Sequence, residues 1–224
     1  MPILKTQDLT KIYPGAEQVV ALNKVNLTIE KGEFVAVMGE SGLGKSTLLH
    51  ILGGVDKPTE GEVMIQDVDI TSLNEKEMTI FRRRNIGIIY KSFNLIPNIT
   101  VEKNILLPLL LDRRQPAPSF FEEIIQTLGI GDKLRRFPHQ LSGGEQQRVA
   151  IARSLVTRPA IILADEPTGN LDRKNTEEIT SLFRLVNQRF QATILLVTHD
   201  EKVALSCDRI LFMVDGTLHR REVL

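Results

Sequence analysis

The segment Gly39-Glu-Ser-Gly-Leu-Gly-Lys-Ser46 constrains this chain more than any other feature of the sequence. It fits the pattern G-x-x-x-x-G-K-[ST] and stands between the apolar run Phe34–Met38, expected as a strand, and Lys45–Leu52, expected as a helix. Glycines let such a loop turn its backbone N–H groups inward, and the following helix points its positive dipole end at the same place. We therefore expect a cradle for phosphate groups, in which Lys45 supplies a point charge and Ser46 ligates Mg²⁺.

A second motif, Ile161-Ile-Leu-Ala-Asp-Glu166, is an apolar run that ends in two adjacent carboxylates. Successive side chains of a strand point in different directions, so the two acids can take different roles. Taken alone, this pattern is more often a solvated loop, but the phosphate loop upstream favours a site. We expect Asp165 to hold the Mg²⁺ shell and Glu166 to polarise an attacking water.

The third motif is Leu141-Ser-Gly-Gly-Glu-Gln-Gln-Arg148, which stands just before an expected helix at 145–156. Backbone amides at a helix N-terminus make an anion pocket. A structural interpretation is also open, in which Ser142 caps the helix and Glu145 completes a capping box. Both interpretations can hold, because a capped helix N-terminus and an anion site are the same physical object.

The remaining pattern predicts an α/β fold. Short strands are expected at 3–9 and 24–29, and a helical region is expected at about 97–159. Strands at 161–164 and 193–197, separated by a helix at 173–189, have the βαβ rhythm of a parallel sheet. A hairpin closes the chain at 210–219. We expect one domain over 1–224, with the helical region as a subdomain inserted in it.

Composition excludes several function classes. The chain has 28 Lys plus Arg and 28 Asp plus Glu, so the positive field that drives nonspecific nucleic-acid binding is missing and no nucleic-acid partner is expected. The single Cys207 excludes an intramolecular disulfide, fits a reducing compartment and is expected to be a small buried residue. The apolar stretch 105–111 is far too short to span a bilayer, and the first residues do not resemble a signal peptide. We expect a cytoplasmic protein whose membrane role comes through a partner.

Together, the order and spacing of four motifs resemble those of an ABC-transporter ATPase subunit. These are the phosphate loop, Leu141-Ser-Gly-Gly-Glu-Gln-Gln, Ala164-Asp-Glu-Pro-Thr-Gly-Asn-Leu-Asp172 and Thr198-His-Asp200, and they cover nearly the whole chain. Asp165-Glu-Pro-Thr-Gly-Asn-Leu-Asp172 together with Ser92-Phe-Asn-Leu-Ile-Pro97 resembles the branch with LolD-, MacB-, FtsE- and BceA-type ATPases. The resemblance implies a P-loop ABC fold with a RecA-like parallel core, an N-terminal antiparallel β subdomain and an inserted helical subdomain.

The resemblance also implies a homodimer in the ATP-bound state, head to tail, in which neither subunit forms a complete site alone. Each ATP would lie between the loop of one subunit (Gly39, Glu40, Ser41, Gly42, Leu43, Gly44, Lys45, Ser46 and Thr47) and the signature of the other (Ser142, Gly143, Gly144 and Gln146). Tyr13 would stack on adenine, since an aromatic face suits any base. His199 would contact the γ-phosphate and act in catalysis with Glu166 and Lys45, and Asp172 would contact the opposite subunit. Without this pattern, Tyr13 is an ordinary surface aromatic and His199 a neighbour of a helix cap.

Two positions depart from the family pattern. Lys91 stands in the coupling loop where family members usually carry Gln, which ligates Mg²⁺ and senses the membrane partner. An ammonium has no acceptor and cannot ligate a metal. Three outcomes stay open: Lys91 points to solvent and a water replaces the ligand, it contacts the γ-phosphate or Glu166, or catalysis and coupling are impaired. Leu43 stands where Ser or Cys is commoner, and little effect is expected because its backbone N–H remains.

The sequence therefore predicts a Mg²⁺-dependent ATPase, peripheral on the inner face of the cell membrane, that serves a separate integral-membrane permease. The branch implies export or extraction of peptide, lipoprotein or antibiotic-like substrates with an FtsX/MacB-like permease. One alternative is an FtsE-like regulatory switch that moves no solute. Another is a soluble ABC ATPase of DNA repair or translation, against which the balanced charge and the absence of a long coiled coil argue.

Overall fold

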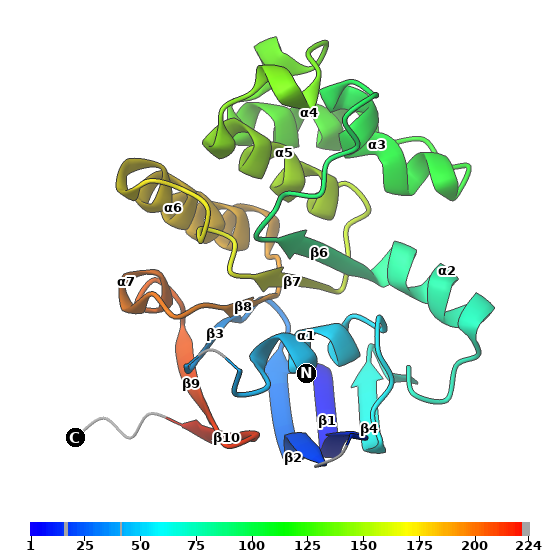
Figure 1. Cartoon of the computed structure of the whole chain (residues 1–224). Helices are drawn as coiled ribbons and strands as arrows, with labels where there is room; N and C mark the ends of the chain where they lie inside the picture. Colours follow the sequence, from blue (N-terminus) through cyan, green and yellow to red (C-terminus); the bar gives the residue numbers. More distant parts are fainter. Residues whose placement is uncertain (16–17, 41, 221–224) are drawn as a thin grey trace.

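The computed structural model describes residues 1–15, 18–40 and 42–220 and shows an α/β architecture built on two sheets (Figure 1). The α/β class and the antiparallel N-terminal sheet expected from the sequence are confirmed. Ser41, the third residue of the expected phosphate loop, lies outside the described residues.

The larger sheet has the strand order β10-β9-β3-β8-β7-β6. Its five parallel strands are β3 (Phe34–Met38), β6 (Ile86–Tyr90), β7 (Ile161–Asp165), β8 (Ile194–Val197) and β9 (Arg209–Val214), and β10 (Thr217–Arg220) is the antiparallel edge. All residues of β3 and β8 are buried, as expected for a parallel sheet that is covered on both faces. The carboxyl ends of β3, β8 and β7 lie side by side, and this edge carries the site described below.

The two faces of this sheet belong to two apolar cores. Leu195 and Val197 of β8 pack with helix α1 (Lys45–Leu52), while Ile194 and Leu196 pack with helix α6 (Arg173–Phe190). This division follows from the alternation of side chains along a strand. Because α1 begins where the phosphate loop ends, burial of its apolar residues against the sheet fixes the loop relative to β7 and β8.

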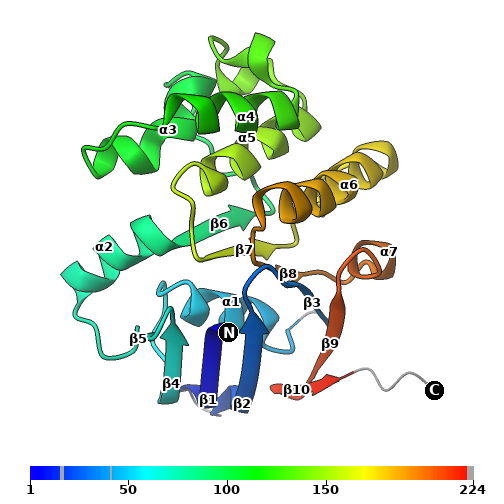
Figure 2. The same ribbon diagram turned by 180° about the vertical axis from the view of Figure 1, so that it is seen from behind.

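The smaller sheet is antiparallel, with the order β2-β1-β4-β5. Its strands are β1 (Pro2–Tyr13), β2 (Val19–Glu30), β4 (Glu60–Ile65) and β5 (Val68–Asp69), so the first two are longer than the predicted strands at 3–9 and 24–29. Their buried side chains share the core of α1. The smaller sheet therefore supports the phosphate loop from the side opposite α6 (Figure 2).

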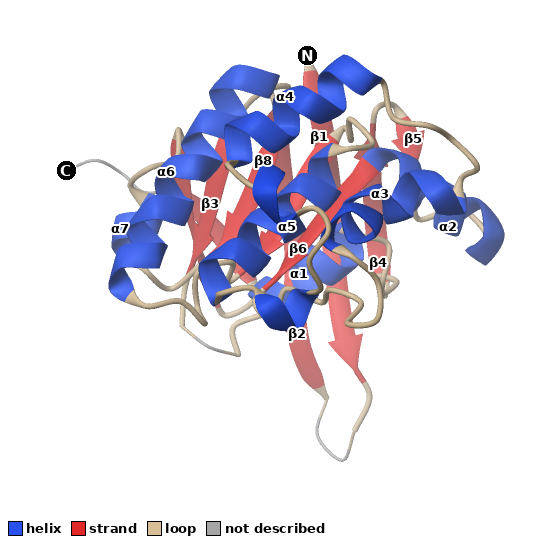
Figure 3. Ribbon diagram, turned by 90° about the horizontal axis from the view of Figure 1, so that it is seen from above, coloured by secondary structure: helices blue, strands red, loops and turns tan. Residues whose placement is uncertain are grey.

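The helices between β5 and β7 lie mostly in the upper part of the molecule in Figure 1. They are α2 (Glu75–Asn85), α3 (Val101–Leu111), α4 (Pro118–Leu128), the 3₁₀ turns η1 (Gly131–Lys133) and η2 (Pro138–Gln140), and α5 (Gly143–Leu155). Helices α3 and α4 pack on α5, whose inner face shares a core with β7 and α6 (Figure 3). Within the described ranges, no helix combines the length and the apolar character needed to cross a bilayer. The boundary of a helical subdomain at about 97–159 stays a prediction.

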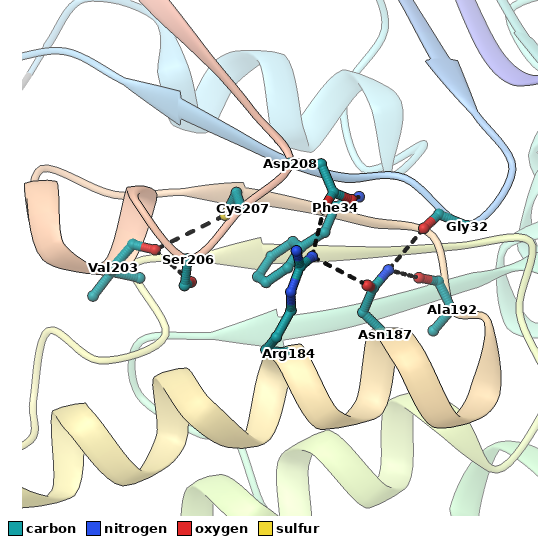
Figure 4. A network of polar contacts seen from close by, with 9 residues as sticks. All are labelled: Gly32, Phe34, Arg184, Asn187, Ala192, Val203, Ser206, Cys207 and Asp208. Carbon is teal, nitrogen blue, oxygen red and sulfur yellow. Dashed lines mark hydrogen bonds and ion pairs between the residues drawn. The ribbon is translucent and has the colours of Figure 1, made fainter.

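Polar contacts fasten the end of α6 to the sheet (Figure 4). Asn187 donates to the carbonyl oxygens of Gly32 and Ala192, at 2.8 and 2.9 Å. Asp208 accepts from the Phe34 backbone N–H at 2.9 Å and from Arg184 at 2.6 Å. The short helix α7 (Glu201–Ala204) follows β8.

Cys207 corrects one expectation, because it is only partly buried. Its sulfur lies 3.9 Å from the Val203 carbonyl oxygen, and burial raises the pKa of its thiol to about 12. The thiol therefore stays protonated at neutral pH.

Candidate functional site

The phosphate loop joins β3 to α1 and depends on glycine at two close approaches. Gly39 has φ 152°, and a Cβ placed on it would lie 2.6 Å from the Met213 carbonyl oxygen. Gly44 has φ 94°, and a Cβ there would overlap the Ala21 carbonyl oxygen. Side chains at these positions would push the loop away from β9 and β2, so the sequence motif has a packing basis as well as a conformational one.

Lys45 is held inside this loop. Its side chain is 7% exposed, and Nζ donates to the carbonyl oxygens of Gly39 and Glu40, at 2.8 and 2.6 Å. Two backbone carbonyls therefore compensate the buried ammonium. The same contacts hold the ammonium at the rim of the loop, where the sequence places a charge for phosphate.

Ser46 and Asp165 meet across the loop, 119 positions apart in sequence. Ser46 Oγ donates to Asp165 Oδ1 at 3.2 Å. Burial raises the pKa of Asp165 above its ordinary value, an effect that the Ser46 hydroxyl opposes. A partly buried carboxylate beside a hydroxyl is an oxygen donor set that suits Mg²⁺, which binds few protein groups and keeps water and phosphate as its other ligands. Within the described ranges, no cluster of three or more His, Cys, Asp or Glu side chains suits a metal.

Glu166 follows β7 directly and faces His199, which follows β8. Glu166 Oε1 lies 2.8 Å from His199 Nδ1. The backbone of Glu166 is in the left-handed region, with φ 46°, and is held by hydrogen bonds from its N–H to Val197 and from the Gly169 N–H to its carbonyl. Left-handed backbone costs a non-glycine residue free energy, and such residues are enriched at functional sites. The turn aims the carboxylate at the imidazole and away from the line of β7.

A cavity of about 580 Å³ brings these groups together. Its walls come from the phosphate loop, from the ends of β7 and β8 and from the loop after β6: Glu40, Gly42, Gly44, Lys45, Ser46, Thr47, Lys91, Glu166 and His199. Gly39, Glu40, Leu43 and His199 also border an adjoining hollow of about 590 Å³. The side chain of Leu43 packs against the core of α1, which explains an apolar residue in the loop.

Tyr13 lies apart from this cavity, at the end of β1, and is 38% exposed. Its hydroxyl donates to Asp56 Oδ2 at 2.9 Å, and the Lys11 ammonium lies 4.8 Å from its ring centroid. Lys11 and Asp56 also form an ion pair at 2.8 Å. The structure thus adds two partners that the sequence did not indicate, and stacking of Tyr13 on adenine stays a prediction.

The signature residues form a second cluster at the start of α5. Ser142 Oγ accepts from the Glu145 N–H at 3.3 Å, and Glu145 Oε2 accepts from the Ser142 N–H at 2.8 Å, so the predicted capping box is confirmed. The Ser142 N–H lowers the pKa of Glu145. Gln146 donates to the Leu141 carbonyl at 3.2 Å.

The signature cluster packs against the start of α6. A Cβ on Gly144 would overlap Asn175 Oδ1, and one on Gly143 would lie 3.3 Å from Leu171. Asp172 caps α6 by accepting from the Asn175 N–H at 2.9 Å, and this backbone contact lowers the pKa of Asp172. None of Ser142, Gly143, Gly144, Gln146 and Asp172 lines the phosphate cavity. In the described part of the chain, the predicted site residues therefore form two separate clusters.

Lys91 occupies the wall of the phosphate cavity although its side chain is exposed. Its Cε and Nζ lie 2.8 and 3.2 Å from the place that a Cβ on Gly169 would take. The Lys91 carbonyl accepts from Asn170 at 3.0 Å. The loop after β6 thus touches the loop that carries Glu166.

This chain is similar to known ATP-binding proteins over nearly its whole length. A family model described as ABC transporter matches residues 22–169. The ABC transporter ATP-binding protein MJ0796 of Methanocaldococcus jannaschii is 44% identical over 99% of this chain and 97% of its own length. Its dimeric structure in a post-hydrolysis state with ADP and Pi has a TM-score of 0.86 and 43% identity over 98% of this chain and 97% of that one.

Two named transport proteins are also similar to this chain. The lipoprotein-releasing system ATP-binding protein LolD of Cytophaga hutchinsonii is 42% identical over 96% of this chain and 98% of its own length. The macrolide export ATP-binding/permease protein MacB of Rhodopirellula baltica is 43% identical over 90% of this chain, which corresponds to 30% of that longer protein.

Proposed function

Since this chain belongs to the ABC transporter family, as an ATP-binding subunit of the LolD and MacB type, we propose that it hydrolyses ATP to drive a membrane partner carried on a separate chain. The observation that carries the proposal is the single cavity in which a phosphate loop with a buried lysine faces a carboxylate paired with an imidazole. Phosphoryl transfer to water needs these parts: cations for the phosphates and a group that orients the water and accepts its proton.

Each group in the cavity has a role that its surroundings support. Lys45 leaves its carbonyl partners for the β- and γ-phosphates, and the inward N–H groups of the loop bind the same oxygens. Glu166 accepts the proton of the attacking water, while His199 holds the carboxylate in place. Positioning and neutralisation of charge account for most of the rate increase in such reactions.

Magnesium is the cofactor that fits this site. Ser46 Oγ and the Asp165 carboxylate would hold it, and it would supply positive charge that neutralises the phosphate oxygens. The raised pKa of Asp165 is consistent with this role, because burial that disfavours the bare carboxylate increases its preference for a cation.

We infer that a second copy completes each nucleotide site. Ser142, Gly143 and Gly144 form an amide-rich helix N-terminus away from the phosphate cavity, so the only way for both clusters to bind one ATP is across two subunits. The similar cassette in the post-hydrolysis structure is described as dimeric. In this arrangement, Asp172 would lie at the interface with Gln146, ATP binding would close the dimer and hydrolysis would reopen it.

A hollow of about 410 Å³ between α2, β6, α3 and α5 is the docking surface that we propose for the membrane partner. Apolar side chains on α3 and basic side chains on α2 and α5 line it, including Leu107, Pro108, Leu111, Arg82, Arg83 and Arg153. Asp112, whose side chain is 4% exposed, pairs with Arg83 and Arg84 at 3.0 and 2.8 Å, so ion pairs orient these two arginines at the edge of the hollow. Tyr90, directly before Lys91, lines the same hollow, which connects the docking surface with the phosphate cavity.

The branch indicates what the partner does. We propose a peripheral subunit on the cytoplasmic face, working with an FtsX/MacB-like permease on peptide, lipoprotein or antibiotic-like substrates. The similar LolD belongs to a lipoprotein-releasing system, and the similar MacB is a macrolide export protein. Cargo recognition would lie in the permease. A regulatory switch without solute transport uses the same cavity and docking surface, so the partner's activity separates the two functions.

Steady-state ATP hydrolysis by the purified chain is the primary test. Activity that requires Mg²⁺ and is lost by at least a hundredfold in Lys45→Ala would support the proposal, whereas equal activity in EDTA or in this variant would contradict it. Leu111→Glu tests the docking surface and should abolish recovery of the protein with membranes. The ATPase activity of the soluble protein should stay unchanged, because Leu111 is 62% exposed and lies outside the phosphate cavity.

A further inference from the structure

Lys91 is a second cation beside the phosphate loop, and neither the motif nor the two clusters above account for it. It follows β6 (Ile86–Tyr90) and lies on the wall of the cavity that Lys45 and Glu166 share. The chain therefore brings one more positive charge to the cavity than the phosphate loop supplies.

The backbone of Lys91 is fixed from two sides. Asn170 donates to its carbonyl at 3.0 Å. Arg153 of α5 donates to the carbonyls of Phe93 and Asn94, at 2.8 and 2.6 Å. The side chain lies over Gly169, where a methyl group would come within 2.8 Å of Cε. Glycine at 169 therefore makes room for the lysine, whose side chain lines the wall of the cavity.

Lys45 and Lys91 differ in the partners that their ammonium groups already have. Lys45 Nζ is bound to two carbonyl oxygens and is 7% exposed. Lys91 is exposed, and among residues 1–15, 18–40 and 42–220 no carboxylate lies within 4.0 Å of its Nζ. An ammonium offers three donors and no acceptor, so the group that suits it in this cavity is an anion. In a phosphate site that anion is an oxygen of the nucleotide.

We propose that Lys91 binds the terminal phosphate of ATP and makes the site favour ATP over ADP. The proposal rests on ATP being the substrate. The phosphate loop, its helix and Lys45 bind the β- and γ-phosphates, and Lys91 comes from a different segment, on a wall of the cavity that Glu166 also lines. The γ-phosphate is the outermost and most highly charged group, so a further cation in the cavity pairs with the phosphate that ADP lacks. A charge-assisted hydrogen bond is roughly twice as strong as a neutral one, so lysine gives a larger preference than a neutral amide.

Equilibrium binding tests the proposal, and it is measured without metal so that ATP is not hydrolysed during the experiment. Dissociation constants of ATP and ADP would be measured by calorimetry in EDTA for the parent, Lys91→Gln, Lys91→Arg and the control Lys103→Gln, which removes an exposed lysine of α3. We expect Lys91→Gln to weaken the binding of ATP by about tenfold and that of ADP by less than about twofold. The binding free energies of the two nucleotides would then change by amounts that differ by about 1.4 kcal/mol or somewhat less. Lys91→Arg should keep the preference, and Lys103→Gln should change neither constant.

Gly169→Ala supplies an independent variant that keeps the lysine. Its backbone φ is outside the left-handed region, so alanine is conformationally allowed, and the added methyl group moves the end of Lys91. We expect the preference for ATP to fall at least threefold in Gly169→Ala. When Gly169→Ala is added to the Lys91→Ala variant, the preference should change by less than about 1.5-fold relative to Lys91→Ala alone. Such coupling would show that Gly169 acts through Lys91.

The outcomes separate this proposal from the proposed function. A parent that binds neither nucleotide would contradict the ATPase assignment itself. A parent that binds both, with equal weakening of ATP and ADP in Lys91→Gln, or with no change, would overturn the role of Lys91 and leave the ATPase assignment intact. An equal effect of Gly169→Ala with and without the lysine would also overturn it.

Discussion

His199 Nδ1 lies 2.8 Å from Glu166 Oε1, although 33 positions separate the two residues. Their strands, β7 and β8, are neighbours in the sheet, which brings the residues after each strand together. With Glu166 ionised, the proton between them belongs to Nδ1. A singly protonated His199 then presents a lone pair at Nε2, so donation to Glu166 and to a phosphate oxygen at once requires both ring protons. A neutral imidazole can serve only one of the two.

Replacement of Glu166 by Gln tests the assigned base. The amide keeps the shape of the side chain but cannot accept a proton, so we expect ATP hydrolysis to fall by at least a hundredfold while ATP binding is retained. Because the nucleotide stays intact, the closed dimer should accumulate with Mg²⁺ and ATP, measured by size-exclusion chromatography with light scattering.

The control for this experiment is Glu177→Gln, which changes an exposed glutamate of α6 away from the cavity. It should hydrolyse ATP at the parent rate. Full turnover by Glu166→Gln would refute the role of Glu166 as base.

Replacement of His199 by Ala removes the group that holds Glu166. We expect kcat to fall by roughly ten- to a hundredfold, since an unheld carboxylate samples unproductive rotamers, while the dissociation constant of ATP in EDTA changes less than about threefold. The measurement compares the change in kcat with the change in the dissociation constant of ATP. A loss confined to binding would mean that His199 acts on the nucleotide and not on Glu166.

Contiguous motifs were readable from the sequence because their chemistry is local. The phosphate loop and the capping box at Ser142 depend on residues within a few positions of one another, and they lie where the pattern predicts. The parallel strands were readable because both faces of the sheet are buried and the runs are uniformly apolar.

Contacts between distant segments could not be read in this way. The Tyr13 hydroxyl donates to Asp56, 43 positions away, and the Lys11 ammonium lies near its ring. The side chain of Lys91 fits only because residue 169 is a glycine. No spacing rule links such positions, since the strand order of the sheet, which is not the chain order, decides which loops meet. The same holds for the left-handed backbone of Glu166, because tertiary hydrogen bonds fix it.

Asn187 provides a stability prediction. Its buried amide donates to Gly32 and Ala192 (Figure 4), so Asn187→Leu leaves two carbonyl oxygens without their donor. We expect the free energy of unfolding to fall by about 2–4 kcal/mol, measured by urea denaturation. Gln188→Leu, at the exposed neighbouring position, should change it by less than about 0.5 kcal/mol. Equal effects of the two changes would show that the amide contacts contribute nothing specific.

Cys207 provides a pH prediction. Its pKa of about 12 in the folded chain leaves roughly one thiolate in ten thousand at pH 8, against about one in five for an unperturbed thiol. Iodoacetamide should therefore label the folded protein roughly a thousandfold more slowly than the urea-unfolded protein at pH 8. Because the folded pKa is raised, the rate should climb about tenfold per pH unit without a plateau up to pH 10. Mass spectrometry would follow the labelling. A plateau of the labelling rate near pH 9 would contradict the burial of this thiol.

Arg153 connects the signature helix to the loop that carries Lys91. Its guanidinium spans the carbonyls of Phe93 and Asn94, whose backbones are left-handed at φ 60° and 48°, and burial lowers its pKa. An ammonium lacks the planar fork, so Arg153→Lys should release this backbone. We expect amide hydrogen exchange at 92–96 to accelerate at least tenfold while exchange in β3 and β8 is unchanged.

The matched control is Arg189→Lys, at an exposed ion pair with Glu123. That pair is weak in water, so exchange at 92–96 should stay at the parent rate. Because the loop borders both the docking hollow and the phosphate cavity, its release should also lower the preference for ATP that we assign to Lys91. Unchanged exchange at 92–96 in Arg153→Lys would mean that Asn170 and the local turn hold the loop without the arginine, and that α5 does not transmit motion through this contact.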